Sequence, residues 1–208
     1  MISIKGELAT YLKRRSEMPI EQLAEFDQLI WERFGIECAI LVSDSSQFSY
    51  KAQVLGIIHY LNLIFRSHEM LFPILRRHEG ELLKAEADNM LAIFPTVENA
   101  VSSAIEMNQV LADYNASVSA DEEYCICIGI GWGRVLRSDN EIFGDEANAA
   151  YKLGEDVAKK NEILLTAAVR EKLDDKMEYT IRHHRMLNLS SFCFDSYKLE
   201  IPANVDSD

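Results

Sequence analysis

Residues 36–43 form a short apolar run, rich in branched side chains, that predicts a buried strand. Similar runs recur along the chain, and they alternate with stretches in which apolar residues return at helical spacing, notably over 51–78 and 97–113. The expected order of elements is βαββαββαβαββ. This order predicts an α+β fold of ferredoxin-like type, in which helices cover a βαββαβ core sheet.

Two hairpins are expected within the sheet. Strands over 81–86 and 90–94 flank the turn residues Ala87-Asp88-Asn89. Residues 124–131 alternate as a strand, and residues 133–137 are expected to return as its partner. A helix over 51–78 is expected to break, if anywhere, near its internal proline at position 73.

The length of 208 residues fits a single main domain. Residues 1–35 predict two helices divided by a proline, an N-terminal helical extension that either packs on the domain or serves as a dimer or sensor appendage. Residues 36–200 form the main domain, and residues 201–208 an acidic tail.

Charge and composition exclude several function classes. A net charge of −13 argues against binding to a nucleic-acid backbone or to an anionic membrane surface. No apolar run approaches the roughly 20 residues that cross a bilayer. The four cysteines lack metal-ligand spacing and are expected to be reduced thiols, which favours a cytoplasmic protein. A nucleotide enzyme remains compatible with the charge, because divalent cations screen phosphates locally.

Two acidic residues interrupt the strand patterns. Asp44 closes the apolar strand at 36–43, and Asp88 lies in the tight turn of the first hairpin. Carboxylates at strand ends suit a hard divalent cation. Taken singly, each is better explained as a helix cap or an ordinary turn residue. If neighbouring strands bring them together, mutual repulsion favours a cation between them. Polar residues and one aromatic residue follow the first acid: Ser45, Ser46, Gln47 and Phe48.

Three further residues are candidates for ligand contacts. Asn148 and Lys152 lie four apart in a helix expected over 145–158, so they share one face that could hold a sugar and a phosphate. A solvated face is the simpler interpretation of that pair. Lys84 lies on the strand before Asp88, where it either protects a sheet edge or points into a pocket to contact a ligand base.

Four segments, taken together, resemble the catalytic domain of the class III adenylyl/guanylyl cyclases. They occur in the family's order and with similar spacing, and the resemblance covers residues 36–200. The segments are AILVSDSSQFS at 39–49, KAEADNMLAIF at 84–94, IGIGWGRVL at 128–136 and EIFGDEANAAYKL at 141–153.

This resemblance implies a nucleotide cyclase that converts a nucleoside triphosphate, with ATP favoured, into a 3′,5′-cyclic nucleotide and pyrophosphate. It implies that Asp44 and Asp88 bind two Mg²⁺ or Mn²⁺ ions and that the backbone of residues 45–48 meets the triphosphate. Lys84 and Glu141 occupy the two positions that contact the base.

The family's site lies between the two subunits of a head-to-tail homodimer. Its metals come from one chain, while the ribose-binding asparagine, here Asn148, and the transition-state cation come from the other. The family's arginine is replaced by Lys152, and the glycine before the turn acid is replaced by Ala87. That alanine is tolerable if its φ angle is negative.

These departures leave two alternatives beside the cyclase. One is a catalytically weakened cyclase-homology domain that binds nucleotide or protein partners. The other is a pyrimidine nucleotide cyclase. Glu141 does not decide the base, since a glutamate can accept hydrogen bonds from adenine or from guanine.

Overall fold

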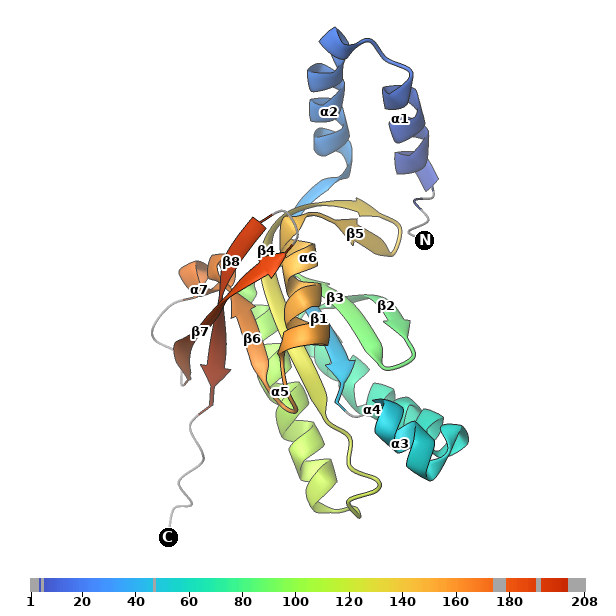
Figure 1. Ribbon diagram of the computed structural model, residues 1–208, viewed down its shortest axis with the longest axis vertical. Helices are drawn as coiled ribbons and strands as arrows, with labels where there is room; N and C mark the ends of the chain where they lie inside the picture. The colour runs from blue at the N-terminus through green and yellow to red at the C-terminus, as the bar shows by residue number, and fades with distance from the viewer. Residues whose placement is uncertain (1–3, 5, 47, 174–178, 190–191, 202–208) are drawn as a thin grey trace.

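The computed structural model describes residue 4 and residues 6–46, 48–173, 179–189 and 192–201. An eight-stranded sheet forms its centre, with the order β2-β3-β1-β4-β6-β8-β7 and with β5 paired to β4 (Figure 1). The strands are β1 Gly35–Ser45, β2 Glu81–Glu86, β3 Asn89–Phe94, β4 Ile126–Ser138, β5 Glu141–Phe143, β6 Ile163–Thr166, β7 Thr180–Leu189 and β8 Phe192–Glu200.

Helices cover both faces of this sheet. They are α1 Gly6–Ser16, α2 Ile20–Phe34, α3 Phe48–Leu55, α4 Ile57–Arg77, α5 Val97–Ala116, α6 Asp145–Tyr151 and α7 Ala167–Lys172, with a π-helix, η1, at Lys152–Val157. The predicted α+β architecture of a sheet covered by helices is therefore confirmed. None of the helices in the described ranges is both long and apolar enough to cross a membrane.

Two predicted elements differ from the structure. Residues 133–137 do not return as a separate strand, because β4 continues to Ser138 and pairs antiparallel with β1 from Gly35↔Leu136 to Ser45↔Ile126. The expected helix over 51–78 is broken at Gly56, whose φ of 85° suits a glycine, and not at the proline inside α4. The chain thus gains a sharp turn between α3 and α4.

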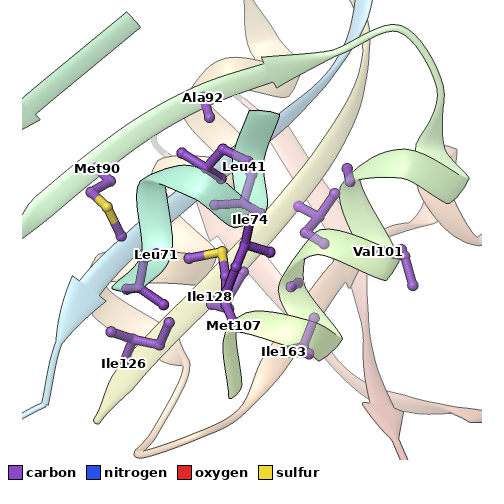
Figure 2. Packing of buried hydrophobic residues seen from close by; sticks show 14 of the residues in the cluster. Leu41, Leu71, Ile74, Met90, Ala92, Val101, Met107, Ile126, Ile128 and Ile163 are labelled. Atoms are coloured by element: carbon purple, nitrogen blue, oxygen red, sulfur yellow. The ribbon is translucent and has the colours of Figure 1, made fainter. Parts of the chain in front are cut away.

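The alternation of side chains along β1 divides the core into two layers. Ala39 and Leu41 face α4 and α5, where they join the largest buried apolar cluster (Figure 2). Cys38, Ile40 and Val42 face the opposite side and pack beneath α6. Because β1 is buried on both faces, its end is held firmly between two helical layers.

The α6–η1 segment lies unusually close to the sheet. A Cβ atom on Gly129 of β4 would lie 2.3 Å from the carbonyl oxygen of Ala150 and 2.5 Å from the amide nitrogen of Gly154. A Cβ on Gly154 would in turn lie 2.7 Å from the carbonyl oxygen of Val42. The glycines of the segment IGIGWG therefore let a helix rest directly on β4.

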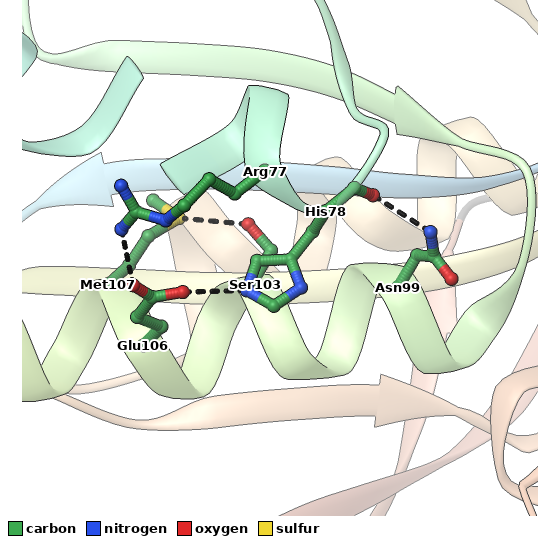
Figure 3. A network of polar contacts seen from close by, with 6 residues as sticks. All are labelled: Arg77, His78, Asn99, Ser103, Glu106 and Met107. Atoms are coloured by element: carbon green, nitrogen blue, oxygen red, sulfur yellow. Dashed lines mark hydrogen bonds and ion pairs between the residues drawn. The ribbon is translucent and has the colours of Figure 1, made fainter. Parts of the chain in front are cut away.

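Polar contacts join the end of α4 to α5 (Figure 3). Glu106 accepts hydrogen bonds from Arg77 and, at 2.7 Å, pairs with His78 Nε2. Asn99 Nδ2 donates to the carbonyl oxygen of His78 at 2.9 Å. These bonds fix the point at which the chain leaves α4 and enters the β2–β3 hairpin.

The N-terminal helices form a hairpin that projects from one end of the sheet (Figure 1). Leu8, Phe26 and Ile30 form its buried centre, and Leu136 and Phe143 of the β4–β5 hairpin pack against them. The extension thus contacts the main domain through one end of the sheet. A dimerising or sensory role for it stays a prediction.

We expect Gly129→Ala to lower the free energy of unfolding by about 3 kcal/mol, since its new Cβ meets immobile backbone. Gly133→Ala is the comparison variant, because its Cβ would meet side-chain carbons of Glu146 and no backbone atom. Its cost should be smaller than that of Gly129→Ala. Urea unfolding of the two variants measures the difference, and equal costs would contradict the close approach of α6.

Candidate functional site

The two acids predicted to meet do so at the end of β1. Asp44 is the penultimate residue of β1, and Asp88 lies in the turn between β2 and β3. β1 and β3 pair antiparallel, with Ser43 opposite Met90, so the end of β1 lies beside the hairpin turn. The two carboxyl groups are close enough to hydrogen-bond to each other. The condition set by the sequence for a cation site is therefore met.

The electrostatics of this pair favour a bound cation. Burial raises the pKa of Asp44 to about 6, and the nearby charges of Asp88 and Glu155 add to the rise. In the cation-free protein, a proton binds Asp44 as the pH falls through about 6. Mg²⁺ is commonly held by one or two protein carboxylates together with substrate phosphates, which is the donor set that this pair offers. Within the described ranges, no group of three or more His, Cys, Asp or Glu side chains forms a metal site.

Glu155 is a neighbour of the pair that the sequence did not reveal. It lies on η1, accepts a hydrogen bond from Asn89 Nδ2 at 3.1 Å, and has a pKa raised by burial and by Asp156 and Asp88. Its position follows from the close contact of η1 with the sheet. A motif search would miss it, because only the three-dimensional packing brings η1 to the hairpin.

The residues after Asp44 make different kinds of hydrogen bond. The hydroxyl of Ser45 donates to Asp88 Oδ2 at 2.5 Å, a side-chain role that was not predicted. The backbone N–H of Ser46 donates to the carbonyl oxygen of Cys125 at 2.9 Å, so this amide is engaged within the protein. Gln47 and the side chain of Phe48 lie outside the described residues.

The two predicted base-contacting residues meet although they are far apart in the chain. Lys84 Nζ of β2 lies 2.9 Å from Glu141 Oε1 of β5, and 3.2 Å from Glu86. Hydrogen bonding to Glu141 raises the pKa of Lys84, so its charge is secure at neutral pH. Tyr151 of α6 is also close, since the charges of Glu141 and Lys84 act on its pKa, which burial raises. A hydrogen-bond donor on β2 and an acceptor on β5 thus lie together.

The third predicted pair lies along α6 and η1. Asn148 is exposed on α6, and its side chain makes no hydrogen bond with the described residues. Lys152 begins the π-helix, so the predicted helix over 145–158 is correct in extent but changes type at this residue. Lys152 Nζ is paired with Asp156 at 2.8 Å, a partner that was not predicted.

Comparisons with known proteins bear on the fold of the chain. No protein-family model matches the sequence. One curated relative, described as putative adenylate cyclase 3 of Rhizobium meliloti strain 1021, is 28% identical over 115 residues. The match covers 55% of this chain but only 20% of that relative's length.

Solved structures match over most of the chain. An adenylate/guanylate cyclase/hydrolase from Silicibacter pomeroyi has a TM-score of 0.70 and 22% identity, and covers 81% of this chain and 98% of its own. The adenylyl cyclase CyaB from P. aeruginosa has a TM-score of 0.70 and 19% identity, and covers 84% and 98%. The guanylyl cyclase Cya2 has a TM-score of 0.71 and 16% identity, and covers 83% and 96%.

This chain has the fold of the class III adenylate/guanylate cyclase catalytic domain. The resemblance inferred from the four sequence segments is thereby confirmed for the fold. In this chain Asp44 lies close to Asp88, and Lys84 contacts Glu141.

One departure from the cyclase motif has a structural cost. Ala87, which stands where the cyclase motif has glycine, has a φ of 51°, so the condition of a negative φ is not met. An alanine in the left-handed region costs about 1 kcal/mol relative to glycine. The hairpin nevertheless keeps the turn that brings Asp88 to β1, because β2 and β3 remain paired up to Glu86↔Asn89.

The raised pKa of Asp44 predicts a pH-dependent stability. A folded-state pKa of about 6, above the ordinary value of 3.8, means that the stabilising protonated form is lost as the pH rises through this range. We expect Asp44→Asn, in chelator-treated protein at pH 8, to gain about 1 kcal/mol after allowance for solvent screening, or about 2–4 °C in Tm.

The gain should shrink toward zero near pH 4, where the wild-type carboxyl is also protonated in the fold. Asp113→Asn on the exposed face of α5 is the matched control, and its Tm should follow the wild type at both pH values. Thermal unfolding followed by circular dichroism measures both variants. If the Tm of Asp44→Asn at pH 8 equals or falls below that of the wild type, the charged form of Asp44 does not destabilise the fold and the prediction is wrong.

Proposed function

We propose that the protein is a nucleotide cyclase that converts a nucleoside triphosphate, ATP in the first place, into a 3′,5′-cyclic nucleotide and pyrophosphate. The observation that carries this proposal is the meeting of Asp44 and Asp88 at the end of β1, in a chain with the cyclase fold. Two Mg²⁺ or Mn²⁺ ions are the proposed cofactors. We further propose a cytoplasmic location, supported by the four free thiols.

In the proposed reaction the ribose 3′-oxygen gives its proton to solvent and bonds to the α-phosphorus, while the bond between the α-phosphorus and the oxygen that bridges it to the β-phosphate breaks and pyrophosphate leaves. The cations, when bound, lower the pKa of the 3′-hydroxyl and neutralise phosphate charge. Asp44 and Asp88 supply the carboxylate oxygens that hold them. Partial burial of Asp44 lowers the local dielectric constant and would strengthen this attraction.

The base would bind at Lys84 and Glu141. The ammonium group donates to a ring nitrogen, and the carboxylate accepts from an exocyclic amine, which fits adenine. These two side chains satisfy each other at 2.9 Å when no base is present. Base binding therefore exchanges one ion pair for two directed hydrogen bonds.

Lys152 is the proposed cation for the transition state, and it favours a second candidate function. Its ion pair with Asp156 must open before it can reach a phosphate, and lysine lacks the planar fork with which arginine spans two phosphate oxygens. This observation supports a weakened cyclase-homology domain, which would bind nucleotide with metal but turn it over slowly or not at all.

A head-to-tail homodimer is proposed to complete the site. Asn148 is exposed, and its side chain makes no hydrogen bond with the described part of its own chain, which suits a residue that acts on a neighbouring subunit. A row of apolar side chains is also exposed along α3 and α4, with Ile58 82% and Phe65 61% exposed. Contiguous apolar surface of this kind is typical of an interface. The other members of the row are Val54, Ile57 and Leu61.

Mass spectrometry of the products from ATP, GTP, CTP and UTP, each with Mn²⁺, tests the proposal directly. We expect 3′,5′-cyclic AMP as the main product, and a loss of at least about 100-fold in Asp88→Asn, which removes a cation ligand. Asp113→Asn, on an exposed face of α5, should retain the wild-type rate.

Other outcomes distinguish the alternatives. A cyclic pyrimidine product would identify a pyrimidine cyclase. Metal-dependent binding of a non-hydrolysable ATP analogue without a cyclic product from any triphosphate would establish the weakened domain.

Mixing two inactive variants tests the shared site. Asp44→Ala and Asn148→Ala should each be inactive alone, since each breaks both sites of its homodimer. Random exchange at a one-to-one ratio makes half of the dimers mixed, each with one intact site, so about a quarter of the wild-type activity should return.

Mixed dimers are confirmed by pulling down one affinity-tagged variant with its untagged partner. Two copies of Asp44→Ala, one tagged and one untagged, are the matched control and should recover nothing. No recovery in confirmed mixed dimers would contradict a site shared between subunits.

A further inference from the structure

A chain of buried hydroxyl groups connects Asp88 to the interior of the protein. Ser45 Oγ donates to Asp88 Oδ2 at 2.5 Å, and a second hydrogen bond joins Ser45 Oγ to the hydroxyl of Tyr60 on α4. Ser45 is 5% exposed and Tyr60 is 1% exposed. Hydrogen bonding also links Tyr60 to the buried Tyr124. The carboxyl group of Asp88 is thus tied to the core and does not stand alone in its turn.

The direction of these bonds follows from the number of hydrogens. A serine hydroxyl carries a single hydrogen, and in this structure it goes to the carboxyl oxygen of Asp88. The hydrogen in the other bond must therefore come from the Tyr60 hydroxyl. Burial raises the pKa of Tyr60 to about 12, so this hydroxyl keeps its proton at neutral pH and remains a donor. Both bonds point toward Asp88.

Side-chain alternation along β1 explains why Asp88 has neighbours on two sides. Ser45 lies in phase with Leu41, on the face covered by α4, where Tyr60 is located. Asp44 lies in phase with Val42, on the opposite face, where Glu155 of η1 acts on its pKa. Asp88 reaches across the end of the strand and contacts both residues.

We propose that Tyr60 is a positioning residue that, acting through the hydroxyl of Ser45, orients the carboxylate of Asp88 for binding a divalent cation. The inference rests on the proposed function, in which Asp88 is a metal ligand. Tyr60 itself touches neither metal nor nucleotide. It fixes the hydrogen of Ser45 on one oxygen of Asp88 and so limits rotation of the carboxylate.

Such control matters for the proposed cofactor. Mg²⁺ requires nearly ideal octahedral geometry, so a carboxylate that rotates freely binds it poorly. Partners that hydrogen-bond to metal ligands typically contribute 10- to 100-fold to metal affinity. The network costs little in the cation-free fold, because the buried Ser45 hydroxyl has both a donor and an acceptor.

The test measures Mn²⁺ binding to the nucleotide-free full chain by electron paramagnetic resonance of the unbound ion. We expect Tyr60→Phe to weaken Mn²⁺ affinity about 10-fold and Ser45→Ala to weaken it at least as much. If Tyr60 acts through Ser45, the double variant should bind no more weakly than Ser45→Ala alone. Turnover of Tyr60→Phe should fall at low Mn²⁺ and recover at saturating Mn²⁺, which general damage to the fold would not allow.

Tyr179→Phe is the matched control, because the Tyr179 hydroxyl is buried without a hydrogen-bond partner in the described part of the chain. Its Mn²⁺ affinity should equal that of the wild type. Thermal unfolding verifies that every variant is folded. Should Tyr60→Phe not fold, Ser45→Ala and Ser45→Thr decide: loss of affinity in the alanine variant with retention in the threonine variant supports the hydroxyl's role.

The outcomes separate this inference from the proposed function. Wild-type affinity in Tyr60→Phe, or additive losses in the double variant, would overturn the positioning role while leaving Asp44 and Asp88 as metal ligands. Wild-type protein that binds no Mn²⁺ would overturn both the inference and the metal chemistry of the proposed function.

Discussion

Repulsion between two carboxyl groups held at the end of one strand dominates the chemistry of this protein. Backbone pairing of β1 with β3 brings Asp44 and Asp88 together. The two side chains cannot move far apart unless this part of the sheet breaks. Burial, and after it the charge of Asp88, raises the pKa of Asp44 to about 6. A proton relieves the cost of an ionised Asp44 at this position, and in the proposed function a divalent cation would relieve it as well.

The close approach of α6 and η1 to the sheet is what gives this pair its surroundings. Gly129 and Gly154 remove the Cβ atoms that would separate helix from strand, and η1 then lies near enough for Glu155 to reach Asn89. The same approach brings Glu146 to the sheet, where its carboxyl group accepts hydrogen bonds from the backbone N–H of Trp132 at 3.2 Å and from Thr166 at 2.8 Å. Backbone packing therefore determines the positions of the residues of α6 and η1, and no single side chain does so.

The sequence predicted the architecture from local patterns, whereas it gave the meeting of the acids only as a condition on strand pairing and through the resemblance to the cyclases. Apolar alternation identified the strands, and the two acids occupied turn and strand-end positions that the pairing of β1 with β3 joins. It could not predict the unbroken β4, because three glycines in six residues are typical of a turn. Their role in the strand becomes evident only from the helix that packs on them. It also missed Tyr60, since an ordinary tyrosine in an amphipathic helix gives no sign that its hydroxyl meets Ser45.

The departures at Ala87 and Lys152 bear on different parts of the proposed chemistry. Ala87 affects only the energy of a turn whose outcome, the position of Asp88, is preserved by strand pairing. Lys152 affects the supply of positive charge, because its ion pair with Asp156 must be broken before the charge can act on a phosphate. The cation site and the transition-state cation are thus separable, and a chain can keep the first while weakening the second. In the proposed chemistry, metal binding and turnover therefore have different physical causes, and each has to be measured on its own.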